Sequence, residues 1–288
     1  MKRKIFLFGR GFLGNYIVNE FKKYGDEVYS SRLTNCSKDD FKIDIRDKNS
    51  IFNVLEKIKP DIIINCVAIT DLDFLEEHPE VGFEINSEGS KNIAIVSEKY
   101  GAKLIHISTD SVFDGKKGMY DENDSVNPIN VYAKTKLLAE KYVKQETTNY
   151  LILRTNFIGY DSEDKNLLNW MISKLSKQET IIGFNDVFFT PIEVSYLSSL
   201  IYKLSSVEES LFLNLSSDKK ISKYDLAIMI CNLFSFNKKL IKKGSSTDIS
   251  FKASRPKDTS LSNEQAKKLL NNNFLSLNDS LKKIKSKF

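Results

Sequence analysis

No stretch of this sequence is apolar for long enough to cross a membrane as a helix, which takes about 20 residues. The apolar run near the N-terminus covers only residues 5–8, after a basic start, and Gly9 ends it. A secretory signal needs a longer apolar region and a cleavage site of small residues. We therefore expect a cytoplasmic protein that makes no membrane contact.

Cysteine and histidine are scarce: the chain has Cys36, Cys66, Cys231, His78 and His106. An odd number of cysteines without C-x-x-C spacing indicates neither a disulfide framework nor a zinc site. With so few thiols and imidazoles, we predict that the protein holds no metal.

A surplus of one charge is also lacking, because 43 basic residues against 38 acidic ones leave a formal net charge of only +5. The basic residues are spread along the chain, and pairs such as Lys238 and Lys239 are typical of solvated helix faces. Nucleic-acid binding needs a clustered basic surface, so we predict no nucleic-acid partner.

What the sequence does contain is a regular alternation of short apolar runs and helical patterns. The runs at residues 5–8, 62–64 and 104–107 are typical of strands buried on both faces. Residues with helical spacing of apolar positions separate them. This alternation predicts an α/β fold built on a doubly wound parallel (Rossmann) sheet.

A glycine-rich loop follows the first apolar run, where residues 9–14 read Gly-Arg-Gly-Phe-Leu-Gly and lead into a helical pattern. In this context the glycines permit a tight turn, let backbone N–H groups approach a pyrophosphate and let helix and strand pack closely. We predict that residues 1–157 form an NAD(P)-binding domain. Residues 158–288 would form a smaller α/β substrate-binding lobe, with residues 186–206 packing back on the first domain.

The second expected strand ends in small hydroxyl residues followed by Arg32, and it has no carboxylate at its tip to hold a ribose 2′-hydroxyl. This favours the 2′-phosphate of NADPH, with NADH as the alternative. Asp44 and Ile45 would flank the adenine, and the small residues at 66–68 would line the nicotinamide side. The residues predicted to bind the cofactor are Gly9, Gly11, Phe12, Leu13, Gly14, Ser31, Arg32, Asp44, Ile45, Cys66, Val67, Ala68, Asn86, Tyr132 and Lys136.

Tyr132 and Lys136 are four residues apart, so on a helix they project from the same face. Thr109 follows the buried run at residues 104–107 and would bring a hydroxyl to the same point. A surface pair on an ordinary helix is the alternative. The upstream glycine loop favours catalysis by Thr109, Tyr132 and Lys136.

Four motifs resemble those of the extended short-chain dehydrogenase/reductases: the glycine loop at 9–14, Asn-Cys-Val-Ala at 65–68, Ser-Thr-Asp at 108–110, and Tyr-x-x-x-Lys at 132–136. Within that superfamily the chain is most similar to dTDP-4-dehydrorhamnose reductases and related nucleotide-sugar reductases. Residues 73–86, 108–115, 130–136, 153–156 and 255–258 carry this closer resemblance. The chain departs from the family pattern in the spacing of its first two glycines, at Ser111 and at Phe157. The last two leave the identity of the sugar open.

The resemblance implies an NAD(P)-dependent oxidoreductase that reduces a nucleotide-linked 4-keto-6-deoxy sugar in deoxysugar and polysaccharide biosynthesis. The reduced nicotinamide would give a hydride to the carbonyl carbon, and Tyr132 would give a proton to its oxygen. Lys136 and the oxidised nicotinamide would lower the pKa of the tyrosine. Residues in irregular segments would contact the sugar beside Thr109: Asn156, Phe157, Arg255 and Lys257, with Phe188 and Phe189 as further candidates.

Other functions stay open. Nucleotide-sugar epimerases and dehydratases use the same tyrosine and lysine, but the dehydratases that resemble this chain have a glutamate where Ser111 stands. A non-catalytic regulator of the same fold, like the regulatory subunit of methionine adenosyltransferase, can retain such residues. Whether two chains pair as a homodimer is also left open.

Overall fold

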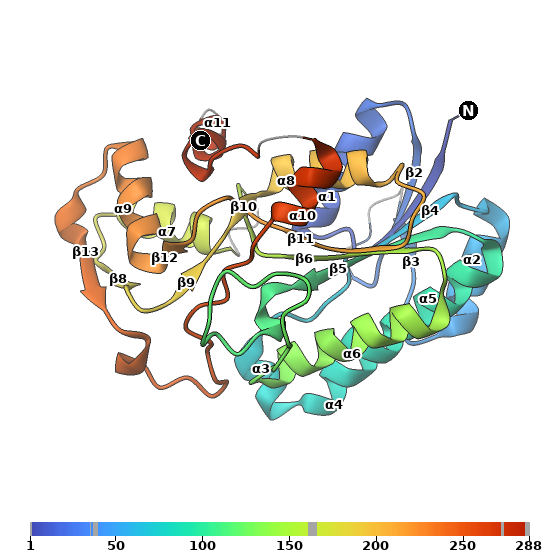
Figure 1. Ribbon diagram of the computed structural model, residues 1–288, viewed down its shortest axis with the longest axis horizontal. Coiled ribbons are helices and arrows are strands. Elements are labelled where there is room, and N and C mark those ends of the chain that lie inside the picture. The colour runs from blue at the N-terminus through green and yellow to red at the C-terminus, as the bar shows by residue number, and fades with distance from the viewer. Residues whose placement is uncertain (1, 35, 37–39, 161–165, 272–273, 286–288) are drawn as a thin grey trace.

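The computed structural model describes residues 2–34, 36, 40–160, 166–271 and 274–285, and its centre is a seven-stranded parallel sheet (Figure 1). In spatial order the strands are β11 (Leu211–Leu215), β6 (Tyr150–Thr155), β5 (Lys103–Thr109), β4 (Ile62–Asn65), β1 (Lys4–Phe8), β2 (Glu27–Arg32) and β3 (Asp40–Lys42). The predicted doubly wound parallel sheet is therefore confirmed.

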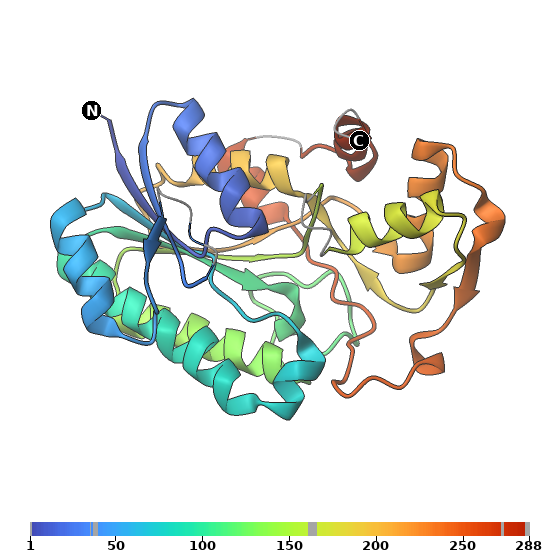
Figure 2. The same ribbon diagram turned by 180° about the vertical axis from the view of Figure 1, so that it is seen from behind.

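Helices cover both faces of this sheet, which explains the uninterrupted apolar runs in its strands. In β1, Ile5 and Leu7 enter the core on one face, while Phe6 and Phe8 enter the core on the other. The first face is covered by α1 (Phe12–Lys23), α8 (Val194–Leu204) and α10 (Glu264–Leu270). The second is covered by α2 (Lys48–Ile58), α5 (Gly89–Tyr100) and α6 (Val131–Glu146), as Figures 1 and 2 show from opposite sides.

The order of the strands creates a crevice between β1 and β4. The chain leaves β1 for α1 on one face of the sheet, but it passes from β4 towards α5 on the other face. The loops after these two strands therefore diverge, and ligands of open α/β sheets bind at such a switch point.

The helical stretch between β4 and β5 is divided into several pieces. Two short helices, α3 (Leu72–Glu77) and α4 (Pro79–Gly82), precede a π-helical turn (Phe83–Glu88) that leads into α5. The side chain of Asn86 in this turn bonds the backbone N–H and C=O of Ile69. A tertiary contact thus accompanies the irregular turn, and the periodicity of the sequence could not indicate it.

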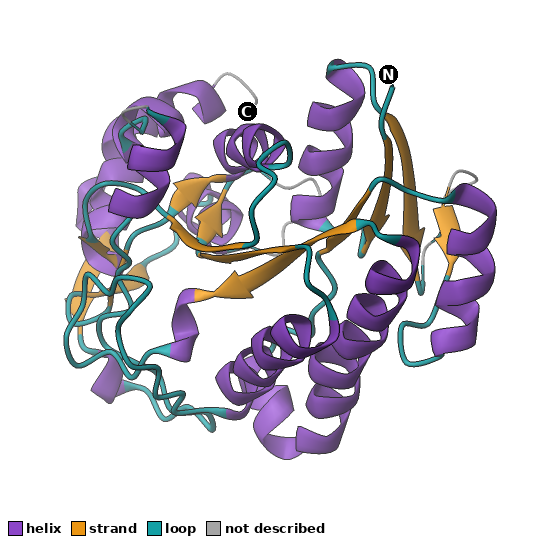
Figure 3. Cartoon of the chain, turned by 45° about the vertical axis from the view of Figure 1, so that its right-hand side comes forward, coloured by secondary structure: helices purple, strands orange, loops and turns teal. Residues whose placement is uncertain are grey.

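The lobe has its own core, with α7 (Leu167–Ser176), α9 (Lys223–Phe234) and α11 (Leu277–Lys285) packed on short strands (Figure 3). These strands form three pairs: β8 (Ile181–Phe184) with β13 (Ile241–Gly244), β9 (Phe188–Phe189) with β12 (Ile221–Ser222), and β7 (Phe157–Ile158) with β10 (Ile192–Glu193). Strand β11 and helix α8 follow residue 157 in sequence but belong to the layers of the large sheet. The division into two domains at residue 157 stays a prediction. Within the described chain, no helix is both long and apolar enough to span a membrane.

Candidate active site

A cavity of about 420 Å³ lies at the carboxyl ends of β1, β4, β5 and β6. Its lining brings together residues that the sequence predicted to bind the cofactor or to react: Gly9, Gly11, Phe12, Leu13, Gly14, Cys66, Ala68, Tyr132 and Lys136. Phe157, predicted to contact the sugar, lines the same cavity. The crevice that the strand order creates therefore contains a cavity, and ionisable side chains line it.

Sequence reasoning missed five lining residues: Thr70, Ile107, Ser108, Thr155 and Asn166. The parallel register of β5 and β6 places Thr109 directly opposite Thr155. The carboxyl ends of parallel strands meet at one edge of a sheet. The place of Thr155 at the end of an apolar strand could therefore have indicated that it lines the cavity. No sequence pattern indicated Asn166, because it reaches the cavity from the lobe.

The glycine loop leaves room where a pyrophosphate would lie. Gly9 has φ +82°, and a Cβ there would stand 2.8 Å from the backbone nitrogen of Val67. A Cβ at Gly14 would stand 2.6 Å from the carbonyl oxygen of Gly9, whereas one at Gly11 would meet no atom within 4 Å. Gly11 is the N-cap residue just before α1, and no side chain caps this end of the helix. The first turn of α1 therefore offers free N–H groups to an anion.

A smaller cavity of about 100 Å³ shares Gly9 with the first. It is lined by the remaining predicted cofactor residues except Asn86, namely Ser31, Arg32, Asp44, Ile45 and Val67, and also by Leu33, Ile43 and Ile85. A large and a small cavity on either side of one glycine loop fit the two ends of a dinucleotide.

Arg32 does have a carboxylate beside it, which sequence reasoning missed. Asp40 belongs to β3 rather than to the tip of β2, and its side chain is almost fully buried. Its oxygens lie 3.6 Å from Arg32 Nε and 3.3 Å from Arg10 Nη1, and Ser30 Oγ donates a 2.7 Å hydrogen bond to it. Two arginines on one carboxylate leave a surplus positive charge, which suits a phosphate.

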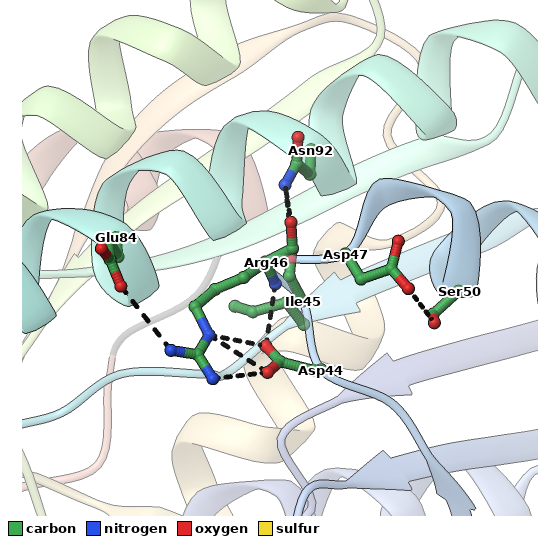
Figure 4. Close-up of polar contacts among 7 residues, drawn as sticks. All are labelled: Asp44, Ile45, Arg46, Asp47, Ser50, Glu84 and Asn92. Atoms are coloured by element: carbon green, nitrogen blue, oxygen red, sulfur yellow. Dashed lines mark hydrogen bonds and ion pairs between the residues drawn. The ribbon is translucent and has the colours of Figure 1, made fainter.

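Asp44 lines the smaller cavity, and Figure 4 shows its hydrogen bonds with Arg46. Its carboxylate accepts hydrogen bonds from the backbone nitrogen of Arg46 at 3.0 Å and from Arg46 Nη2 at 2.6 Å. The hydrogen bond with the Arg46 side chain lowers the pKa of Asp44. Asn92 Nδ2 donates to the carbonyl oxygen of Ile45 at 3.0 Å. Hydrogen bonds within the protein thus hold both residues at this edge of the cavity.

Asn86 lines neither cavity, although the sequence analysis grouped it with the cofactor residues. Its side chain accepts a 2.8 Å hydrogen bond from the nitrogen of Ile69 and donates to the carbonyl of Ile69 and to Thr135. Cys66, Ala68 and Thr70 of the same loop line the larger cavity. Asn86 thus acts on the cavity by holding this loop.

Tyr132 projects from the first turn of α6, which Asn130 caps by accepting a 2.9 Å hydrogen bond from the nitrogen of Ala133. Burial raises the pKa of Tyr132 to about 12, a hydrogen bond with Thr109 lowers it, and the charge of Asp110 raises it. The sequence analysis expected Lys136 and the oxidised nicotinamide to lower this pKa, and that effect needs the bound cofactor. Among the protein groups burial outweighs the other effects, and the phenol is protonated at neutral pH, as an ordinary tyrosine is.

Lys136 lies one turn further along the same face and donates a 2.7 Å hydrogen bond to the carbonyl oxygen of Ile107. Burial lowers its pKa to about 8, while the negative charge of Glu140 opposes this shift. The lysine is therefore anchored to the sheet rather than bonded to the tyrosine.

A buried ion pair stands behind Lys136, one further turn along α6. Glu140 accepts hydrogen bonds from Arg154 Nε at 2.9 Å and Arg154 Nη2 at 2.7 Å, and from the hydroxyl of Ser108. The side chains of Glu140 and Arg154 are 4% and 5% exposed. With so little water nearby, the charge of Glu140 acts strongly on its neighbours.

The carboxylate of Asp110 is hydrogen-bonded to several polar groups next to Thr109. It accepts hydrogen bonds from Thr109 Oγ1 at 3.2 Å, Asn156 Nδ2 at 2.9 Å and Thr259 Oγ1 at 2.7 Å. Burial raises the pKa of Asp110, and the charge of Lys223 opposes this rise. Asn156, predicted to contact the sugar, is therefore bonded to Asp110 in the structure.

The remaining residues predicted for the sugar lie outside the larger cavity's lining. Arg255 Nη2 lies 3.0 Å from Asp73, and Lys257 Nζ lies 3.4 Å from Asp186. Phe189 is 1% exposed in the lobe core. Phe188, its neighbour in β9, lies beneath Lys220.

Comparisons with known proteins agree with this arrangement. The family model described as RmlD substrate binding domain matches residues 3–288. A protein of Haloferax volcanii, named as a probable low-salt glycan biosynthesis reductase, is 29% identical over 87% of this chain and 86% of its own length. The methionine adenosyltransferase 2 subunit beta of Bos taurus is 26% identical over 81% of this chain and 72% of its own. A crystal structure of dTDP-4-dehydrorhamnose reductase from Bacillus anthracis, in complex with NADP, superposes with a TM-score of 0.90 at 27% identity, covering 100% of both chains.

Proposed function

Since the chain belongs to the RmlD substrate binding domain family, we propose that it is an NADPH-dependent reductase of a nucleotide-linked 4-keto-6-deoxy sugar. The observation that carries this proposal is the wall of one cavity, where Tyr132 and Lys136 face the glycine loop. The resemblance to an NADP-bound dTDP-4-dehydrorhamnose reductase over the full length supports the same cofactor and substrate class.

The residues of the two cavities suit the cofactor. The first turn of α1 would hold the pyrophosphate, Arg10 and Arg32 would hold the 2′-phosphate, and Asp44 with Ile45 would border the adenine. When bound, the reduced nicotinamide supplies the hydride for the carbonyl carbon. The chain's own residues supply the proton and fix the carbonyl.

Tyr132 is the proton donor in this proposal. Its pKa of about 12 keeps the phenol protonated until negative charge develops on the carbonyl oxygen. Thr109 would hydrogen-bond the same oxygen and align it. Lys136, anchored by the carbonyl oxygen of Ile107, would stabilise the phenolate that forms after the proton has moved.

A substrate panel tests the proposal. The purified protein is mixed with NADPH and, in turn, with 4-keto-6-deoxy sugars linked to dTDP, GDP, CDP and UDP, and the loss of reduced-cofactor absorbance is followed. We expect oxidation of NADPH with at least one of them, and much slower oxidation with NADH. No turnover with any sugar would contradict the proposal.

The relative from Bos taurus supports a second candidate, a non-catalytic regulatory subunit. A protein of this kind would bind NADPH but leave every sugar of the panel unreduced, and it would change the activity of a partner enzyme. The same panel also separates reduction from epimerisation and dehydration, because only reduction consumes the cofactor stoichiometrically.

We also propose that the protein is cytoplasmic and that two chains pair as a homodimer. Fractionation of cells tests the first, and light scattering of the purified protein at micromolar concentration tests the second.

A further inference from the structure

His106 is a buried side chain that takes no part in the proposed mechanism. It belongs to β5 and is 0% exposed. In the parallel register it lies opposite Asn65, the last residue of β4. The two side chains meet there, because Asn65 Nδ2 lies 3.3 Å from His106 Nδ1. The loop that follows Asn65 borders both cavities, so this contact lies next to the cofactor site.

The amide of Asn65 can point only one way. Its Oδ1 accepts a 3.0 Å hydrogen bond from the backbone N–H of Val67, which can only donate. The NH₂ group therefore faces Ser90 and His106. Ser90 Oγ lies 3.0 Å from Asn65 Nδ2 and donates its own proton to the carbonyl oxygen of Asn86 at 2.7 Å, so it accepts from Asn65. The second proton of the amide is left for His106 Nδ1.

This hydrogen bond decides where the imidazole carries its proton. Because Asn65 donates, His106 Nδ1 must accept, and a neutral ring then has its proton on Nε2. Burial lowers the pKa of His106 well below its ordinary value, and the charge of Lys136 lowers it too. His106 Nε2 is buried and has no hydrogen-bond partner among the described residues. An apolar side chain would avoid this unpaired donor, so packing alone does not explain the histidine.

The amide of Asn65 holds the loop between the two cavities. Cys66 and Ala68 line the larger cavity, and Val67 lines the smaller one. Gly9 packs against the backbone of Val67, since a Cβ at Gly9 would stand 2.8 Å from the nitrogen of Val67. A half-turn of the Asn65 amide would set its NH₂ against the N–H of Val67, so that two donors meet. The orientation of one amide therefore bears on the wall of both cavities.

Resting on the proposed function, we propose that His106 is a positioning residue for the cofactor and that it acts through Asn65. His106 Nδ1 fixes the orientation of the Asn65 amide, and Asn65 Oδ1 fixes the loop of residues 66–68 against the glycine loop. The imidazole itself lines neither cavity. Its contribution is therefore the acceptor at Nδ1 rather than the volume of the ring.

The state of the imidazole can be measured directly, because His78 is the only other histidine of the chain. The side chain of His78 is 49% exposed whereas His106 is buried, so the two rings should give separate signals. Nitrogen-15 NMR of the histidine-labelled protein, assigned with His78→Gln, should show His106 neutral with its proton on Nε2 from about pH 5.5 to 8. A proton on Nδ1, or titration of His106 in that range, would overturn the proposal.

Two substitutions separate the acceptor from the volume. In His106→Asn the amide oxygen can take the place of Nδ1, but the shorter side chain leaves a hole in the core. His106→Leu fills more of the space but offers no acceptor. Fluorescence titration gives the Kd for NADPH without sugar. His106→Leu should raise it at least about fivefold, the effect of one lost hydrogen bond, and His106→Asn should recover most of that affinity.

The stability of the two variants should follow the opposite order. His106→Asn should unfold at a lower denaturant concentration than His106→Leu, because it leaves the larger cavity in the core. The better binder is thus expected to be the less stable protein. If the histidine only fills space, NADPH affinity will instead follow stability, with His106→Asn the weaker binder, and the proposal is then wrong.

A double variant tests the route through Asn65. Asn65→Ala should weaken NADPH binding by itself, and His106→Leu should add nothing further in the double variant, because residues that act through one contact are not additive. His78→Leu, at an exposed position, is the control and should leave the affinity unaltered. Additive losses would show that His106 acts by another route and would overturn the proposal.

These measurements also separate the role of His106 from the proposed function. Failure of the unmodified protein to bind NADPH would refute the proposed function, and the role of His106 with it. NADPH binding with the expected contrasts, but no reduction of any sugar, would refute the reductase alone and support the role of His106.

Discussion

Tyr132 is protonated at neutral pH, as an ordinary tyrosine with a pKa of about 10 would be, and burial raises its pKa further to about 12. A proton donor in a carbonyl reduction must hold its proton until the oxygen becomes basic. The hydrogen bond with Thr109 works in the opposite direction and makes the phenolate more accessible. At the scale of the residue, the site is thus prepared to give a proton rather than to take one.

Replacement of this tyrosine tests its role. Tyr132→Phe should lower kcat by a factor of about 10²–10⁴, the usual contribution of a positioned acid, and leave the Kd for NADPH within about twofold. Stopped-flow absorbance and fluorescence titration give the two quantities. A variant with near-normal turnover would remove Tyr132 from the mechanism.

The charge of Lys136 depends on Glu140. Burial lowers the pKa of Lys136 to about 8, and the carboxylate of Glu140 opposes that shift. The other titratable neighbours of Lys136 stay neutral, because burial raises the pKa of Cys66 to about 12 and lowers that of His106 well below its ordinary value. Activity should therefore be lost above about pH 8, where Lys136 loses its proton together with Lys223, whose pKa burial lowers to the same value.

Glu140→Gln should move this basic limb of kcat/KM to lower pH. The sign follows because removal of a negative charge makes the protonated lysine less favourable, so its pKa falls further below 8. The pH profile between 6 and 10 is the measurement. An unchanged basic limb would show that Glu140 does not act on Lys136.

The same substitution should cost stability, because it leaves Arg154 charged and unpaired in the core. We expect a loss of about 3–5 kcal/mol in the free energy of unfolding. Adding Arg154→Met should recover most of this loss in denaturant titrations. The double variant therefore allows the pH profile to be measured on a folded protein if the single variant is too unstable.

At the scale of the element, the glycine loop combines two different steric requirements. Gly14 is required by the protein itself, because a Cβ there would stand 2.6 Å from the carbonyl oxygen of Gly9. Gly11 is not, because a Cβ there would meet no protein atom and its φ of −92° is open to any residue. The glycine at position 11 therefore indicates a ligand rather than a tight turn.

Two alanine substitutions should separate these requirements. Gly14→Ala should lower the free energy of unfolding by about 1–3 kcal/mol through overpacking. Gly11→Ala should cost at most about 1 kcal/mol but weaken NADPH binding by about tenfold or more, since the methyl group would occupy the place of the pyrophosphate. Thermal unfolding and cofactor titration of both variants check this contrast. Normal NADPH affinity in Gly11→Ala would place the cofactor elsewhere.

At the scale of the whole molecule, a segment of the lobe is tied across the large domain. Asp73 in α3 accepts hydrogen bonds from the nitrogen of Ala253 at 2.9 Å and from Arg255 Nη2 at 3.0 Å. Asn130, which caps the helix of Tyr132, donates a 2.9 Å hydrogen bond to the carbonyl oxygen of Ser254. These hydrogen bonds join residues 253–255 to α3 and to the N-terminus of the helix that carries Tyr132.

Loss of this tie should affect the sugar more than the cofactor. Asp73→Ala should raise the KM for the nucleotide sugar severalfold and leave the Kd for NADPH unchanged, because neither cavity at the glycine loop includes Asp73. The free energy of unfolding should fall by at most about 1 kcal/mol, since the pair is partly exposed. Asp279→Ala, in an exposed pair on α11, is the matched control. A larger change in NADPH affinity than in KM would contradict the prediction.

Sequence patterns determined the parallel sheet, the glycine loop and the position of Tyr132 and Lys136 on one helix face, because all three depend on local spacing. Apolar runs of four residues, a glycine at a fixed offset and side chains one helical turn apart can be read without knowledge of distant contacts. The wall of the larger cavity includes Tyr132, Lys136 and most of the loop.

Only the tertiary structure decided the contacts between side chains on different strands and helices. It set Asp40 beside Arg32, Glu140 against Arg154, and Asn166 on the wall of a cavity built mainly by the sheet. It also buried Tyr132, and this burial raises the pKa of the phenol. The physical reason is that burial, charge and unmet hydrogen bonds depend on distances through space, which a single sequence does not specify.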